Sequence, residues 1–254
     1  FNNKYPYRSS MSLTMRKSFK KLSKEIKNKY KPKMLLEIGS NDGALICNFK
    51  KKKFLDIEFC KNLAEIKKKK GFKTYNNYWD IRLSNKLKSI YGHIDLIYSS
   101  NTLTHISNLN NVFKSINNIL SSKGILIIED PSLLECIKKN SYDQFYNEHI
   151  YLFSAIAVKK LLEKFKLEIF DIKNLSTHGG SLRYYIKKKI NKKLKITKNV
   201  KKQIDKEINY GLGKLNTYKK FSKNVKKSKI NLLRILHKIK LNKKKIIGYE
   251  ETNK

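Results

Sequence analysis

Short apolar runs alternate along most of the chain with segments whose apolar residues recur at helical spacing. The apolar runs have the length and continuity of buried parallel strands, and they occupy residues 34–39, 54–59, 72–75, 94–100 and 124–130. Helical spacing occupies residues 12–30, 44–52, 82–90 and 109–120, together with a lysine-rich stretch that ends at Gly71. This alternation predicts a parallel sheet with helices on both of its faces.

The pattern changes after Pro131. A helix is predicted at 155–165, followed by two strands at 167–175 and 181–190 that can pair antiparallel. Residues 199–240 have apolar positions at helical spacing and predict one or two long helices. We therefore expect three parts: an N-terminal segment at 1–30 that closes the site, a ligand-binding α/β domain at 31–190, and a helical segment at 191–254.

Polar residues at the ends of the first two apolar runs indicate a ligand site, because ligands of open α/β sheets bind beyond the carboxyl ends of the strands. After Glu37, Gly39 lets the backbone approach a ligand closely, and Asn41 tolerates left-handed geometry. Gly43 permits close packing of the segment that follows. About twenty residues on, Glu58 ends the second run, where a carboxylate can accept hydrogen bonds from ribose hydroxyls.

The same loop matches neither the dinucleotide fingerprint nor the phosphate-binding Walker loop. An acidic residue at the strand end repels phosphates but suits a ligand with an amino acid group. The two carboxylates therefore predict a nucleoside with a polar tail that is cationic or zwitterionic. A glycine-rich turn next to a surface glutamate by chance is the alternative interpretation.

The composition is strongly basic. Of 254 residues, 58 are Lys or Arg, and the formal net charge is +38. Attraction to nucleic acid or to an anionic membrane is one interpretation. We favour a composition bias, because lysine is abundant in every segment, far outnumbers arginine and is interleaved with few aromatic residues.

Cysteine usage and hydropathy indicate the compartment. Cys47, Cys60 and Cys136 lie far apart, without histidines at ligand spacing, so no metal site is expected and a reducing compartment is indicated. No apolar run approaches the length of a membrane-spanning helix, and the N-terminal residues lack the apolar core of a signal peptide. These features predict a cytoplasmic protein without a membrane partner.

EIGSNDG at 37–43 resembles the cofactor loop of the bacterial sugar C-methyltransferase family, whose members methylate a ring carbon of nucleotide-linked keto-deoxysugars. Further landmarks follow in that family's order: YPY at 5–7, SSNTLTHISNL at 99–109, IIEDPSLLE at 127–135, FYNEHIYLFS at 145–154, THGGSLRYY at 177–185 and KIIGYEETNK at 245–254. The resemblance spans nearly the whole chain, and NEH with HGGSLR is its most specific part. It implies a Rossmann-like class I methyltransferase fold: a mostly parallel seven-stranded sheet with an antiparallel edge strand, and S-adenosyl-L-methionine as cofactor.

The resemblance also implies catalytic roles. Removing a proton next to a ketone requires a base and a partner for the enolate oxygen. By resemblance, His149 is the general base, Tyr146 donates a hydrogen bond to the enolate oxygen, and Glu148 orients His149 or contacts the sugar. A loop histidine and a packing tyrosine are the alternative interpretations.

The resemblance assigns further residues to ligand binding. The cofactor is expected to contact Glu37, Gly39, Asn41, Asp42, Gly43, Glu58 and Asn101. His105 is expected to support that pocket. The nucleotide-sugar substrate is expected to contact Tyr7, His178, Gly179, Gly180, Ser181 and Arg183. Arg183 would offset phosphate charge, and the alternatives are that Tyr7 is a packing residue and Arg183 an exposed surface residue.

Three departures from the family pattern are present. No cysteine-rich zinc-binding domain precedes the fold, Asn147 replaces the first His of H-E-H, and GYEETNK replaces a GYGA-type loop. We therefore expect a truncated chain with an incomplete C-terminal subdomain. The alternative functions are methylation of RNA or of another small molecule, and a catalytically silent nucleic-acid-binding remnant. RNA is not the expected partner, because SSNTLTH at 99–105 lacks the Asn/Asp-Pro-Pro-aromatic motif of amino-nitrogen base methylation. The oligomeric state is not predicted.

Overall fold

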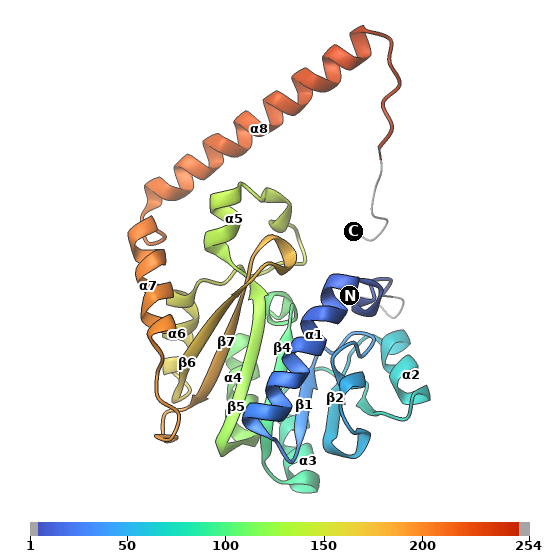
Figure 1. Cartoon of the computed structure of the whole chain (residues 1–254), viewed down its shortest axis with the longest axis vertical. Coiled ribbons are helices and arrows are strands. Elements are labelled where there is room, and N and C mark those ends of the chain that lie inside the picture. Colours follow the sequence, from blue (N-terminus) through green and yellow to red (C-terminus); the bar gives the residue numbers. More distant parts are fainter. Residues whose placement is uncertain (1–4, 249–254) are drawn as a thin grey trace.

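One seven-stranded sheet organises the molecule, a computed structural model that describes residues 5–248. The strand order is β3-β2-β1-β4-β5-β7-β6 (Figure 1). The strands are β1 (Leu35–Ile38), β2 (Phe54–Ile57), β3 (Lys73–Tyr75), β4 (Ile94–Ser100), β5 (Leu120–Pro131), β6 (Leu167–Leu175) and β7 (Ser181–Lys188). All pairings are parallel except those of β7, which runs antiparallel to both β5 and β6. The predicted mostly parallel sheet is confirmed, and its antiparallel strand lies next to the edge strand β6.

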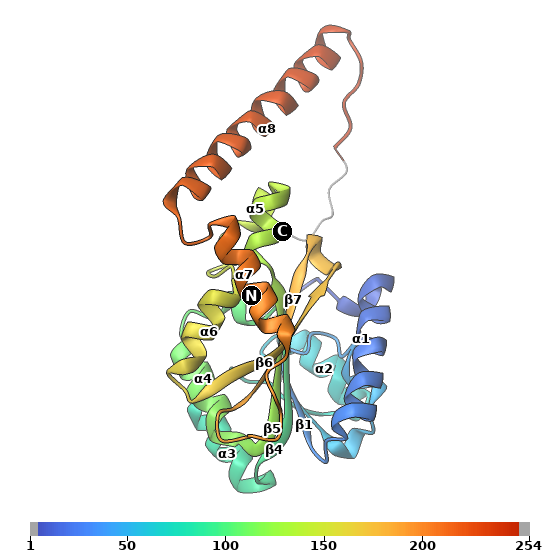
Figure 2. The ribbon, with the colours of Figure 1, turned by 60° about the vertical axis from the view of Figure 1, so that its left-hand side comes forward.

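Helices cover both faces of the sheet (Figures 1 and 2). They are α1 (Leu13–Glu25), α2 (Lys61–Lys69), α3 (Ile81–Tyr91), α4 (Leu109–Ile119), α5 (Leu133–Lys139), α6 (Ala155–Glu163), α7 (Lys198–Tyr210) and α8 (Leu215–Leu241). Helix α1 packs on one face, and α3, α4 and α6 pack on the other. The predicted Rossmann-like α/β architecture is therefore present.

Strand periodicity places the acidic residues of the site. Successive side chains of a strand point to opposite faces, so Leu36 packs in the core with α3 and α4, whereas Leu35 packs in the core with α1. Glu37 shares the face of Leu35 by this alternation. On β2, Phe54 faces the α1 core, and Asp56 follows it on the same face. The polar side chains at the ends of β1 and β2 therefore lie on the α1 side of the sheet.

The predicted helix at 44–52 is wrong. The segment forms two short 3-10 helices, Ile46–Asn48 and Lys51–Lys53, instead. The Asn48 side-chain amide donates to the carbonyl oxygens of Ala44 and Leu45 at 3.0 and 3.1 Å. The side-chain amide thus competes with backbone N–H groups for the carbonyl acceptors that an α-helix would use, which is why asparagine is unfavourable inside helices.

The C-terminal segment forms two helices, within the range of the prediction. Helix α7 packs beside β6 and α6. Helix α8 has no buried residue and extends away from the sheet (Figures 1 and 2). No helix within residues 5–248 combines the length and apolar composition needed to cross a membrane. Most of the last family landmark, residues 249–254, lies outside the described residues.

Candidate active site

The loop that follows β1 has the backbone geometry expected from its residue types. Gly39, Asn41 and Gly43 have φ angles of +70°, +53° and +88°. At Gly39 the absence of a side chain is also a steric requirement, because a Cβ there would lie 2.2 Å from Thr102 Oγ1. The loop can therefore turn sharply beside the end of β1 only with glycine at this position.

Glu37 lines a cavity of about 920 Å³, with Gly39 and Asn41 also in its wall. The carboxylate is buried, and Oε2 has no hydrogen-bond partner among the described residues. Burial raises the pKa of Glu37 well above its usual value; Asp56 adds to this increase, and Lys67 opposes it. A cationic ligand group would supply the opposite charge that this carboxylate lacks.

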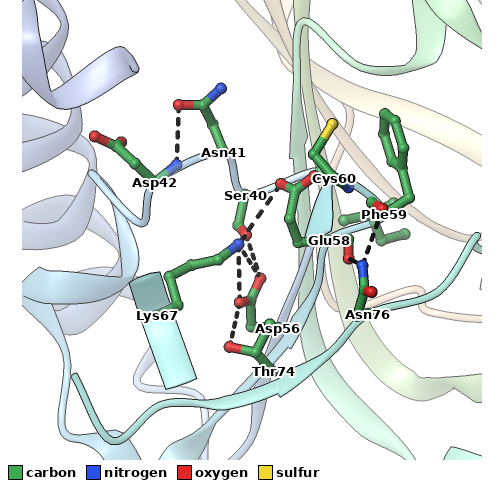
Figure 3. A network of polar contacts seen from close by, with 12 residues as sticks. Ser40, Asn41, Asp42, Asp56, Glu58, Phe59, Cys60, Lys67, Thr74 and Asn76 are labelled. Carbon is green, nitrogen blue, oxygen red and sulfur yellow. Dashed lines mark hydrogen bonds and ion pairs between the residues drawn. The ribbon is translucent and has the colours of Figure 1, made fainter. Parts of the chain in front are cut away.

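Glu58 lines the same cavity and is held in a fixed orientation (Figure 3). The backbone N–H of Cys60 donates to Glu58 Oε1 at 2.9 Å, and Lys67 Nζ lies 3.6 Å from Oε2. Burial raises the pKa of Glu58, and Lys67 opposes this increase. An oriented carboxylate of this kind can accept two hydrogen bonds from vicinal hydroxyls.

His149 and Tyr146 form a hydrogen-bonded pair in the cavity wall. His149 Nδ1 lies 2.8 Å from the carbonyl oxygen of Gln144. Because a carbonyl oxygen only accepts, Nδ1 carries a proton, and Nε2 can act as an acceptor when the ring is neutral. Tyr146 Oη lies 2.9 Å from His149 Nε2 and donates to it. The pair therefore presents an imidazole nitrogen that can take up a proton, next to a hydroxyl donor.

Two further histidines line the cavity. His105 Nδ1 donates to the carbonyl oxygen of Glu148 at 2.7 Å, and its ring centroid lies 4.9 Å from that of His149. His178 Nε2 accepts from Asn101 Nδ2 at 3.1 Å. Burial lowers the pKa of both His105 and His178, and the nearby His149 lowers each further. These imidazoles are therefore kept neutral near pH 7.

The N-terminal segment lies against the cofactor loop. Tyr7 lines the cavity, and its backbone carbonyl oxygen accepts a hydrogen bond from Asn41 Nδ2 at 3.1 Å. Ser9 N donates to Asn41 Oδ1 at 2.9 Å, and Ser10 N donates to Asp42 Oδ1 at 3.2 Å. Asp42 thus anchors the N-terminal segment to the loop.

Of the residues expected to bind cofactor or substrate or to act in catalysis, ten line this cavity together: Tyr7, Glu37, Gly39, Asn41, Glu58, Asn101, Tyr146, Glu148, His149 and His178. Six do not line it: Asp42, Gly43, Gly179, Gly180, Ser181 and Arg183. Gly43 packs against Ile46 and Lys67, and Gly180 packs against Glu135.

Arg183, expected to offset phosphate charge, lies outside the cavity wall. Arg183 is buried on β7, where its Nη2 lies 2.8 Å from Glu129 Oε2 and Nε donates to the same oxygen at 2.9 Å. The register of β5 and β7 pairs these two residues directly. Ser181 is also buried, and its hydroxyl donates to the carbonyl oxygen of Thr177 at 3.0 Å. Both side chains stabilise the sheet and its adjoining turn.

The sequence interpretation missed other residues of the site. Ser40, Tyr5 and Phe59 also line the cavity. Asp56 and Lys67 lie beside it and contact Glu58 or its neighbours. The sequence could have indicated Asp56, because it is an acidic residue inside the apolar run at 54–59. It could not have indicated Lys67, which is one of several consecutive lysines.

The site fits the cofactor that the sequence suggested. The unsatisfied oxygen of buried Glu37 suits the ammonium group of S-adenosylmethionine, and the oriented Glu58 suits its ribose hydroxyls. The cavity volume lies in the usual range of small-molecule sites. Within residues 5–248, no group of three or more His, Cys, Asp or Glu side chains has the arrangement of a metal site.

Comparisons with known proteins agree with this interpretation. Residues 7–171 match the family described as methyltransferase domain, and residues 176–254 match the C-methyltransferase C-terminal domain. The C-methyltransferase NovU of Streptomyces niveus is 26% identical over 151 residues, which cover 59% of this chain and 36% of the relative. The chain thus spans about a third of the length of that curated relative.

Solved structures share the fold. An S-adenosylmethionine-dependent methyltransferase from Clostridium acetobutylicum has a TM-score of 0.52 at 18% identity, covering 70% of this chain and 93% of that chain. A magnesium protoporphyrin IX methyltransferase from Synechocystis, solved with S-adenosylhomocysteine bound, has a TM-score of 0.51 at 12% identity, covering 69% and 84%. At these identities the likeness shows the fold alone.

The fold and the family matches together define the class of S-adenosylmethionine-dependent methyltransferases. The chain belongs to the methyltransferase domain family, and its C-terminal part is similar to the C-terminal domain of C-methyltransferases. The predicted cofactor, S-adenosylmethionine, is confirmed, and the predicted resemblance is confirmed as a likeness to C-methyltransferases.

Proposed function

We propose that this protein transfers a methyl group from S-adenosylmethionine to a ring carbon adjacent to the ketone of a nucleotide-linked deoxysugar. The observation that carries the proposal is the His149–Tyr146 pair, whose acceptor nitrogen lines the same cavity as Glu37 and Glu58. A carbon acid needs such a base beside a methyl donor, whereas a nucleophilic oxygen or nitrogen substrate depends on it less.

The residues of the site divide the chemistry between them. Glu37 binds the cofactor ammonium, and Glu58 binds its ribose. When bound, the cofactor supplies an electrophilic methyl group. His149 Nε2 takes the proton from the carbon next to the ketone, and the electron pair of that C–H bond forms the enolate. The cofactor held by Glu37 and Glu58 would supply the methyl group that the enolate carbon accepts, and its sulfur would keep the electron pair of the C–S bond.

Tyr146 would stabilise the enolate. Its hydroxyl can rotate from His149 Nε2 to the substrate oxygen on which negative charge develops. Tyr7, Glu148 and His178 line the remaining wall and would contact the sugar. His105 donates from Nδ1 to the carbonyl oxygen of Glu148 and so fixes the backbone beside His149.

The test is methyl transfer to 4-keto sugar nucleotides, detected by mass spectrometry of the products. His149→Asn should reduce methyl transfer by at least ~100-fold, the usual size of a general-base contribution, while S-adenosylhomocysteine binding persists. His237→Asn on exposed α8 is the matched control and should retain full activity. Unchanged turnover of His149→Asn would reject the assignment of the base.

A further inference from the structure

A buried lysine beside the cofactor site has no role in the chemistry described above. Lys67 lies on α2, and its side chain is completely buried. Its ammonium group lies 3.0 Å from Asp56 Oδ2 and 3.6 Å from Glu58 Oε2, and it donates to Ser40 Oγ. Figure 3 shows the side chain reaching from α2 to the point where these three side chains converge. Lys67 therefore connects the cofactor loop, β2 and Glu58.

The hydrogen bonds and the charge of Asp56 are satisfied by Ser40, Thr74 and Lys67. Thr74 Oγ1 donates to Asp56 Oδ2 at 2.7 Å, and Ser40 Oγ donates to Asp56 Oδ1. With Lys67 also bound, Asp56 has the compensating charge and the hydrogen bonds that a buried ion pair requires. The approach of the same ammonium to Glu58 is an additional contact that neutralisation of Asp56 does not require.

The Lys67–Asp56 ion pair has its positive group next to Glu58. The charged and titratable groups around Glu58 are Lys67 from α2, Asp56 from β2, Glu37 from β1 and the thiol of Cys60. Lys67 lowers the pKa of Glu58 more than Asp56 raises it, whereas for Glu37 the effect of Asp56 is the larger. The positive end of the pair thus acts on Glu58, and the negative end acts on Glu37.

We propose that Lys67 is a positioning residue for cofactor binding, whose ammonium group holds the Glu58 carboxylate in the orientation that accepts the ribose hydroxyls. Asp56 keeps the buried charge balanced, and Ser40 links the pair to the cofactor loop. The inference rests on the cofactor part of the proposed function and is independent of the sugar substrate.

The test removes the ion pair as a unit. Lys67→Met alone would leave Asp56 buried and unpaired, and the loss of folding would obscure any effect on binding. The double variant Asp56→Asn/Lys67→Met removes both charges at similar volume and should fold, as its melting temperature would report. We expect its dissociation constant for S-adenosylhomocysteine at pH 7 to rise about tenfold, the size of one lost charge-assisted contact.

The control background is Glu58→Gln. If Lys67 acts through Glu58, the Asp56→Asn/Lys67→Met change should not weaken binding further in that background. Removing Asp56 also lowers the pKa of Glu37, and this effect is common to both backgrounds and cancels in the comparison. The loss that depends on Glu58 should shrink from pH 6 to pH 9, because Glu58 without Lys67 ionises at higher pH.

Equal losses in the two backgrounds, or no loss in either, would overturn the inference, because Lys67 would then serve only the fold. If the double variant does not fold, Asp56→Asn/Lys67→Gln is the second variant, and the same comparison decides. A wild-type chain that binds S-adenosylhomocysteine but methylates no keto sugar would reject the proposed function and leave this inference standing. A wild-type chain that does not bind S-adenosylhomocysteine would reject both.

Discussion

Glu37 combines two opposing properties at the scale of a single residue. Burial and the nearby Asp56 raise its pKa, and both therefore favour the protonated carboxyl. Its proposed ligand is an ammonium group, which favours the carboxylate. Lys67 offsets only part of the cost of this charge. Cofactor binding at Glu37 should therefore be coupled to loss of a proton.

The first prediction concerns this coupling. Cofactor binding requires ionised Glu37, so affinity should fall as pH drops below the raised pKa and should reach a plateau above it. Calorimetric titration with S-adenosylhomocysteine, in two buffers of different ionisation enthalpy, should detect proton release. Glu37→Gln should reduce the proton release and weaken binding by at least ~10-fold. Glu163→Gln on the exposed face of α6 is the control. Buffer-independent heats for the wild-type protein would contradict the coupling.

A second prediction concerns Tyr146. If its hydroxyl stabilises the enolate, Tyr146→Phe should lower kcat by about 100-fold with little change in KM, because the lost hydrogen bond strengthens only as charge develops. The measurement is steady-state kinetics with the keto sugar substrate. Tyr142→Phe changes a nearby exposed tyrosine and should be neutral. A rise in KM with unchanged kcat would assign Tyr146 to substrate binding instead.

At the scale of elements, α7 holds the end of the loop that carries His149. Glu207 on α7 is buried and accepts from the backbone N–H groups of Ala155 and Ile156 at 2.9 and 3.1 Å. The N–H groups in the first turn of a helix have no acceptor within the helix, so Glu207 supplies one from α7. The helix dipole also favours a carboxylate at this end of α6. Because α6 directly follows the loop, this contact fixes where the loop ends.

Glu207→Ala should therefore destabilise the protein by about 2 kcal/mol, the usual cost of leaving buried backbone donors without a charged acceptor. Urea unfolding followed by circular dichroism measures the change. Asp205→Ala changes an exposed residue of the same helix and should stay within about 0.5 kcal/mol of wild type. Equal effects of the two substitutions would show that the cap contributes nothing to stability.

The elements that could be predicted from the sequence are those whose signal is local. The seven strands are short apolar or alternating runs, and the cofactor loop carries glycine and asparagine where left-handed geometry is needed. Helix α5 was not predicted, and the helix at 44–52 was predicted wrongly because the side-chain bonds of Asn48 compete with its backbone.

The site residues that could not be predicted depend on contacts between distant elements. Arg183 faces Glu129 because of the register of β5 and β7, which join residues 54 positions apart. Lys67 differs from its neighbouring lysines only in the direction in which α2 presents it. Both are tertiary properties, so motif spacing carries no information about them.

At the scale of the whole molecule, the described residues spread positive charge over the surface and contribute no Lys or Arg to the cavity wall. Each of the eight α-helices within residues 5–248 carries at least one exposed lysine, and these helices include α1 on one face of the sheet and α3, α4 and α6 on the other. The described residues that line the cavity include four acidic residues, Glu37, Glu58, Asp143 and Glu148, and no Lys or Arg. A composition bias explains this distribution better than one basic face leading to the cavity does.

This distribution yields a last prediction, which separates the proposed function from methylation of RNA. Single-stranded RNA should bind weakly over the general surface and lose affinity by about 10³-fold or more between 50 and 200 mM salt. Fluorescence anisotropy measures this loss, and heparin should behave in the same way because only charge is recognised. Saturating RNA should leave the dissociation constant of S-adenosylhomocysteine unchanged, since binding to lysines spread over the surface does not involve the cavity. RNA that binds at physiological salt, accepts a methyl group and shows coupling to the cofactor would favour the RNA methyltransferase alternative over the sugar C-methyltransferase.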